Sequence, residues 1–306
     1  VLSIQNLSVA FKSNTGLNEV LHGISYDLFP NEILGIVGES GSGKSVASLA
    51  IMGLLPPKKS VIGSGEIVFK SEDILHYSQT QLEALRGQKI AMIFQEPMSA
   101  LNPSMCCGAQ VEEILLQHTS ISKKAAKEEV MRLFNDVKIP TPNETFKKYP
   151  HEISGGQQQR VMIAMAIACK PDVLIADEPT TALDVTVQKD IIALLKTLQE
   201  ESKMSVIFIS HDLALVSEIA DRILVMYKGD IVESGTTKSV FKTPKEDYTK
   251  ALIGARPTLK LRLKQLPTIS DFLSDTISKT VISKSDRAEK HKEIYSQAPL
   301  LEVINL

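Results

Sequence analysis

The sequence contains no tryptophan, only 5% aromatic residues, and three cysteines in 306 residues. Two of the cysteines, Cys106 and Cys107, are adjacent, so the three cannot form a disulfide framework or supply a four-ligand zinc site alone. This cysteine content is typical of a protein from a reducing compartment. The longest apolar run, Val161 to Cys169, has nine residues, well short of the roughly 20 that a membrane-spanning helix needs.

Neither sign of charge is in excess. The chain has 34 Lys and Arg against 36 Asp and Glu, a formal net charge of −2. A dedicated nucleic-acid-binding protein carries a strong basic excess, so no nucleic-acid partner is expected. With 43% hydrophobic and 23% charged residues, the composition is that of a soluble globular protein long enough to bury a sizeable core.

The order of apolar segments predicts an α/β fold. Buried strands are expected at 33–37, 173–176, 205–209 and 222–226, with helices at 186–200 and 213–220, and this alternation is typical of a mostly parallel core sheet. Residues 1–32 and 60–75 are expected to form a small antiparallel β subdomain, and residues 96–165 a helical insertion. We assign residues 1–256 to this domain and 257–299, where the pattern weakens, to a C-terminal extension or linker.

The first chemical motif is the glycine-rich string GESGSGKS, residues 38–45, which follows a predicted strand and opens a helix. Its spacing matches the phosphate-binding loop G-x-x-x-x-G-K-[ST]. Backbone N–H groups of such a loop face phosphate oxygens, its lysine reaches the β and γ phosphates, and its final hydroxyl binds Mg²⁺. The predicted nucleotide-binding residues are Gly38, Ser40, Gly41, Ser42, Gly43, Lys44, Ser45 and Val46.

Two consecutive carboxylates follow the buried strand at 173–176. Asp177 is the expected second protein ligand of Mg²⁺, beside Ser45. Glu178 is placed to orient or deprotonate a water that attacks the γ-phosphate; the alternative is a solvated loop charge. The pair predicts hydrolysis of a nucleoside triphosphate with Mg²⁺ as cofactor.

The string ISGGQQQR, residues 153–160, resembles the signature sequence of ABC ATPases. The family's other motifs follow the same order: Gln95 resembles the Q-loop glutamine, Ala182-Leu183-Asp184 the D-loop and His211 the switch histidine. Longer strings at 97–103, 149–152 and 176–186 are similar to those of the ATP-binding subunits of bacterial oligopeptide and dipeptide permeases. The resemblance covers about residues 1–267.

The resemblance implies further roles. Ser154, Gly155, Gly156 and Gln157 would bind the ATP held by a second domain, head to tail, and their position at a helix N-terminus suits an anion. His211 would contact the γ-phosphate, and Gln95 would complete the metal and water shell. Phe11 stands where the family has an aromatic residue that stacks on adenine, although core packing explains it nearly as well.

The expected function is that of an ATP-hydrolysing motor for import of peptides or related small solutes. It implies integral-membrane permease subunits, indirectly a solute-binding protein, and a peripheral location at the cytoplasmic face of the bacterial inner membrane. A soluble tandem ABC ATPase acting on the ribosome is the alternative. A redox or metal role for Cys106 and Cys107 has no supporting ligand pattern, so packing is the preferred interpretation.

The two ends of the sequence resemble each other. VLSIQNL at residues 1–7 is similar to LLEVINL at residues 300–306, and both are typical of a first strand. We therefore expect residues 300–306 to be the opening strand of a second ATP-binding domain in a tandem polypeptide.

Overall fold

The structure is a computed structural model that describes the chain apart from residues 15, 182, 256–262, 265–267, 275–279 and 304–306. The chain divides into two compact units, Val1–Thr243 and Pro244–Leu306. Among the described helices, none is long and apolar enough to cross a membrane.

A six-stranded sheet forms the core of the first unit, in the order β10-β9-β3-β8-β7-β6. Its strands from β9 to β6 are parallel, and β10 pairs with β9 in the antiparallel sense. The strands are β3 (Ile33–Val37), β6 (Ile90–Ile93), β7 (Val173–Asp177), β8 (Ser205–Ser210), β9 (Arg222–Tyr227) and β10 (Asp230–Thr236). Every residue of β3, β6, β7 and β8 is buried, as expected of parallel strands covered on both faces.

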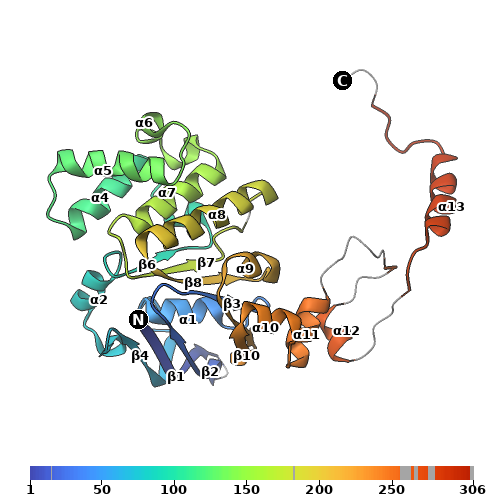
Figure 1. Cartoon of the computed structure of the whole chain (residues 1–306), viewed down its shortest axis with the longest axis horizontal. Helices are drawn as coiled ribbons and strands as arrows, with labels where there is room; N and C mark the ends of the chain where they lie inside the picture. The colour runs from blue at the N-terminus through green and yellow to red at the C-terminus, as the bar shows by residue number, and fades with distance from the viewer. Residues whose placement is uncertain (15, 182, 256–262, 265–267, 275–279, 304–306) are drawn as a thin grey trace. The chain divides into compact units, whose positions relative to one another are not determined.

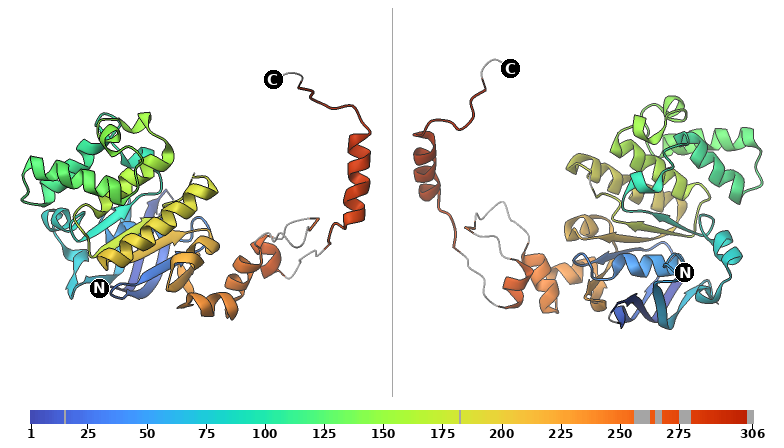
Figure 2. Two further views of the ribbon diagram at one scale, coloured as in Figure 1. Left: turned by 45° about the horizontal axis from the view of Figure 1, so that its top comes forward. Right: turned by 180° about the vertical axis from the view of Figure 1, so that it is seen from behind.

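A second, antiparallel sheet has the order β2-β1-β4-β5. It consists of β1 (Leu2–Ser13), β2 (Gly16–Leu28), β4 (Ser60–Phe69) and β5 (Glu72–Asp73). Helix α1 (Lys44–Ile51) lies between the two sheets (Figures 1 and 2). Its buried Ala47 and Ile51 share one apolar core with Leu7 of the antiparallel sheet and Ile209 of the core sheet. The helix that follows the phosphate loop is thus fixed from both sides.

Short and long helices fill most of the stretch from 97 to 167, as the sequence predicts. They are α3 (Pro97–Ala100), α4 (Cys107–His118), α5 (Lys123–Asp136), α6 (Pro142–Thr145), the 3₁₀ turn Pro150–Glu152 and α7 (Gly155–Ile167). Ser122 caps α5 by accepting a hydrogen bond from the Ala125 N–H, which places the break between α4 and α5 at 119–122.

The remaining helices of the first unit connect or extend the strands. They are α2 (Gln79–Leu85), preceded by the 3₁₀ turn Ile74–His76, then α8 (Val185–Ser202), α9 (Leu213–Ile219) and α10 (Thr237–Lys242). Helices α8 and α9 agree with the predicted 186–200 and 213–220 to within two residues.

The second unit contains α11 (Asp247–Gly254), α12 (Ile269–Leu273) and α13 (Lys284–Tyr295). The predicted opening strand at 300–306 lies partly outside the described residues, since 304–306 are not described. Residues 300–303 are exposed and form neither strand nor helix.

Candidate nucleotide site

The phosphate loop connects β3 to α1 through a backbone that requires glycine. Gly38, Gly41 and Gly43 have φ angles of +155°, +82° and +101°. At Gly38 a Cβ atom would lie 2.1 Å from the carbonyl oxygen of Met226 in β9, closer than any side chain tolerates. The loop is therefore held against the core sheet, with α1 beginning at Lys44.

Lys44 lies inside the curl of this loop. Its Nζ donates hydrogen bonds to the carbonyl oxygens of Gly38 and Glu39, both at 2.8 Å, and to Ser42 Oγ at 3.3 Å. The residue is 4% exposed, and burial lowers the pKa of its ammonium group against the opposing attraction of Glu178 and Asp177. A buried cation inside a glycine-rich loop at a helix N-terminus suits the oxygens of a polyphosphate.

A hollow of about 170 Å³ opens at the loop. Eight of the residues that line it are predicted by the sequence motifs; they are Ser40, Gly41, Gly43, Lys44, Ser45, Val46, Gln95 and Glu178. Val20 of β2 is the ninth, and it belongs to none of the sequence motifs. Its position follows from tertiary packing, since a Cβ on Gly43 would lie 3.2 Å from the Val20 carbonyl oxygen.

Asp177 ends β7 beside the loop and is 5% exposed. Burial raises the pKa of its carboxyl group, and a hydrogen bond with Ser45 acts in the opposite direction. Its Oδ1 atom is buried and has no hydrogen-bond partner among the described residues. A buried carboxylate oxygen without a partner, next to a serine hydroxyl, fits a divalent cation.

Ser45 and Asp177 would hold Mg²⁺, with Gln95 the third predicted ligand. Bound there, the ion would neutralise charge that develops on the phosphates. Within the described residues, no group of three or more His, Cys, Asp or Glu side chains could hold a metal ion. Magnesium at nucleotide sites needs no such cage, because it takes one or two protein ligands together with phosphate and water oxygens.

Glu178 stands at a strained turn where three elements converge. Its φ is +47°, a left-handed conformation that is uncommon for a residue with a side chain and that concentrates at functional sites. Its Oε2 accepts hydrogen bonds from Gln95 Nε2 at 3.2 Å and Thr181 Oγ1 at 2.9 Å, and lies 3.0 Å from His211 Nδ1. The structure therefore brings together Gln95, Glu178 and His211, which follow β6, β7 and β8.

The signature residues lie apart from this hollow. Ser154 caps α7, its Oγ accepting from the Gln157 N–H at 3.4 Å while Gln157 Oε1 accepts from the Ser154 N–H at 3.2 Å. Ser154 and Gly155 are exposed, and none of the four signature residues lines the hollow. The nearest heavy atom to a Cβ on Gly155 would be Leu183 Cδ2, at 3.9 Å.

Two other residues singled out in the sequence lie outside the hollow. Phe11 pairs with Asn18 in the β1–β2 hairpin, is half-buried against the apolar core, and does not line the hollow. Cys107 is fully buried, and burial raises the pKa of its thiol to about 11, so it is not a reactive thiolate at neutral pH.

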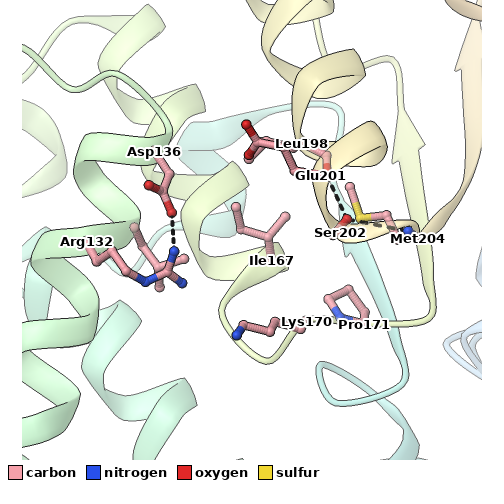
Figure 3. Close-up of a pocket in the computed structure, with 10 residues that line it drawn as sticks. Arg132, Asp136, Ile167, Lys170, Pro171, Leu198, Glu201, Ser202 and Met204 are labelled. Atoms are coloured by element: carbon pink, nitrogen blue, oxygen red, sulfur yellow. Dashed lines mark hydrogen bonds and ion pairs between the residues drawn. The ribbon is translucent and has the colours of Figure 1, made fainter.

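A larger hollow of about 350 Å³ lies among α5, α7 and α8 (Figure 3). Two of its lining residues, Pro171 and Met204, lie two residues before β7 and one residue before β8, so the hollow opens at the amino ends of these parallel strands. The phosphate loop follows the carboxyl end of β3, at the opposite edge of the sheet, where α/β proteins bind ligands. The hollow in Figure 3 is therefore separate from the nucleotide site.

A phosphate loop, a buried aspartate on a neighbouring strand and a convergent Gln–Glu–His cluster define a P-loop ATPase. The family model described as "ABC transporter" matches residues 21–181, more than half of the chain. The chain belongs to this family and is an ATP-hydrolysing domain.

Curated relatives and solved structures agree with this assignment. The chain is 49% identical to the dipeptide transport ATP-binding protein DppD of Bacillus subtilis, over 91% of this chain and 83% of DppD. It is 46% identical to the glutathione import ATP-binding protein GsiA of Escherichia coli O157:H7, over 85% of this chain and 42% of GsiA. A dimeric post-hydrolysis state of the ATP-binding cassette MJ0796 with ADP and Pi superposes with a TM-score of 0.70 at 26% identity, covering 78% of this chain and 99% of that one.

Proposed function

We propose that the chain is the ATP-hydrolysing subunit of a bacterial ABC importer for peptides or related small solutes. The observation that carries the proposal is the 49% identity to a dipeptide transport subunit over 91% of the chain, with the nucleotide site intact. It would act at the cytoplasmic face of the cell membrane. The ribosome-bound alternative has no specific observation in its favour.

Within the site, Glu178 orients or deprotonates the attacking water, and His211 and Gln95 hold the γ-phosphate, water and metal shell around it. The three side chains meet at one carboxylate oxygen, beside the loop whose Lys44 faces the phosphates.

Two such domains would work as a head-to-tail pair. The exposed signature cap at Ser154 and Gly155 lies apart from the chain's own hollow, so it is available to close over a nucleotide held by another domain. The dimeric arrangement of the related cassette MJ0796 supports this arrangement.

The membrane subunits would dock at an apolar groove of about 290 Å³ next to Gln95. The groove is lined mainly by apolar residues, among them Leu54, Phe94, Ile114, Met162 and Met165. On the adjoining Pro97–Pro103 segment, Met98 is 65% exposed. Leu101 is 3% exposed, so it packs inside and cannot serve as a docking residue.

We also propose that a second ATP-binding domain is fused to this one in the same polypeptide. It is supported by the similarity of residues 1–7 to 300–306 and by GsiA of Shigella boydii, which aligns with 100% of this chain over 49% of its own length. The match to DppD covers 83% of that protein, which instead favours a polypeptide with one ATP-binding domain. The mass of the native polypeptide distinguishes the two.

Purification from native membranes tests the function. We expect integral-membrane subunits to co-purify and the reconstituted complex to take up short peptides only with hydrolysable ATP. Co-sedimentation with ribosomes and no membrane subunit would overturn the importer proposal.

A further inference from the structure

Glu178 has a third hydrogen-bond partner, Thr181, to which the sequence motifs assign no role. Thr181 Oγ1 lies 2.9 Å from Glu178 Oε2, closer than Gln95 Nε2 at 3.2 Å or His211 Nδ1 at 3.0 Å. Because a threonine hydroxyl can donate to a carboxylate in any protonation state of the neighbouring histidine, this contact is independent of His211.

Thr181 belongs to the same tight turn as the glutamate that it contacts. The Thr181 N–H donates to the Glu178 carbonyl oxygen at 3.1 Å, and the Glu178 N–H donates to Ile209 of β8 at 3.0 Å. Farther along, Gln188 Nε2 donates to the Thr180 carbonyl oxygen at 3.1 Å, which ties the turn to α8. The turn is therefore anchored to the core sheet at one end and to a long helix at the other.

The other two partners come from separate elements and have more freedom. The His211 side chain is 60% exposed, whereas that of Glu178 is 14% exposed. Gln95 is also exposed, at the end of β6. Gln95 and His211 can therefore give up their contacts with Glu178 and contact phosphate, metal or water instead, without disturbing the turn. Thr181 is held in the turn itself, so its contact with Glu178 is broken less easily.

We propose that Thr181 is a positioning residue that holds Glu178 Oε2 throughout the ATPase cycle, leaving Oε1 to face the attacking water. Among the described residues, no hydrogen bond to Oε1 is present. The hydroxyl also restrains a side chain whose backbone is strained at φ +47°. This inference rests on the proposed role of Glu178.

The test is Thr181→Val, which keeps the branched shape and removes the hydroxyl. Measured on the complex purified from native membranes, kcat for ATP hydrolysis should fall on the order of 10- to 100-fold, because a misplaced carboxylate misaligns the water. The KM for ATP and the melting temperature should stay close to those of the wild type. Thr181→Ser, which restores a hydroxyl, should recover most of the lost rate.

A matched control is Thr197→Val on α8, where the hydroxyl donates only to the Ala193 carbonyl oxygen of its own helix. It should leave kcat and KM unchanged. Wild-type kcat in Thr181→Val, equal losses in the Val and Ser variants, or a loss confined to KM and stability would each overturn the inference. If Glu178→Gln also hydrolyses ATP normally, the proposed role of Glu178 fails instead.

Discussion

Asp177 and Glu178 are consecutive residues whose carboxylates lie in different surroundings. Asp177 ends β7 with a buried oxygen that has no partner among the described residues, next to Ser45. The backbone of Glu178 is left-handed, and its own side chain points toward Gln95, Thr181 and His211. Two adjacent carboxylates can thus serve a metal and a water separately, because their environments differ.

Replacing Glu178 with Gln should separate binding from hydrolysis. The amide keeps the size of the side chain and loses the base, so hydrolysis should fall by on the order of 10² to 10⁴ while Mg-ATP still binds. Single-turnover hydrolysis and equilibrium nucleotide binding measure the two effects. Near-normal turnover in the assembled complex would remove Glu178 from its assigned role.

Met98→Glu should uncouple ATP hydrolysis from transport. Met98 is 65% exposed beside the apolar groove, and a buried charge at a docking surface is costly unless it is paired. Peptide uptake per ATP hydrolysed should drop while ATP affinity stays unchanged, and Met98→Leu should behave like the wild type. Crosslinks from residue 98 that never reach a membrane subunit would contradict the placement.

Gly35→Ala should destabilise the domain by about 1–3 kcal/mol, since overpacking a tight core costs that much. A Cβ on Gly35 of β3 would lie 2.2 Å from Val216 Cγ1 and 3.0 Å from Ala220 Cβ. Urea unfolding of Gly35→Ala, Val216→Ala and the double variant measures the clash, and the double variant should lose less than the sum of the two. Gly63→Ala is the control, because its nearest neighbour would be Ser8 Cβ at 3.8 Å. Additive losses would show that Val216 is not the obstacle.

The ion pair between His22 and Asp230 should make stability depend on pH. His22 Nδ1 lies 3.2 Å from Asp230 Oδ2, and this hydrogen bond raises the pKa of His22 above 6.5. A raised folded-state pKa stabilises the fold below the unfolded value, and the gain disappears as pH rises through the folded value. Asp230→Asn should therefore lower the melting temperature at about pH 5.5 and have little effect at about pH 8.5. An equal effect at both pH values would mean that His22 does not titrate against Asp230.

The sequence predicts those parts of the molecule that depend on local pattern. The loop at 38–45, the buried strand before Asp177 and the helices α8 and α9 carry strong apolar periodicity or fixed spacing, and the structure agrees. Strand β10 is not predicted, because it lies at the edge of its sheet and buries just one of its seven residues. Val20 depends on a contact between elements, which no spacing rule encodes. The contact of Thr181 with Glu178 is local, but it depends on the left-handed backbone of Glu178, which the sequence does not show. The burial of Leu101 could not be predicted either, because an apolar residue in a proline-rich loop can pack in the core or contact a partner.

Oxygen atoms of the phosphate loop compete with a bound phosphate for the ammonium group of Lys44. The ammonium group already donates to two carbonyl oxygens and a hydroxyl of the loop, at 2.8, 2.8 and 3.3 Å. A triphosphate must take over these same N–H donors, so the affinity for ATP is the difference between two well-formed sets of hydrogen bonds. The net gain on binding is therefore smaller than the phosphate contacts alone would give, because Lys44 is already satisfied by the loop without nucleotide.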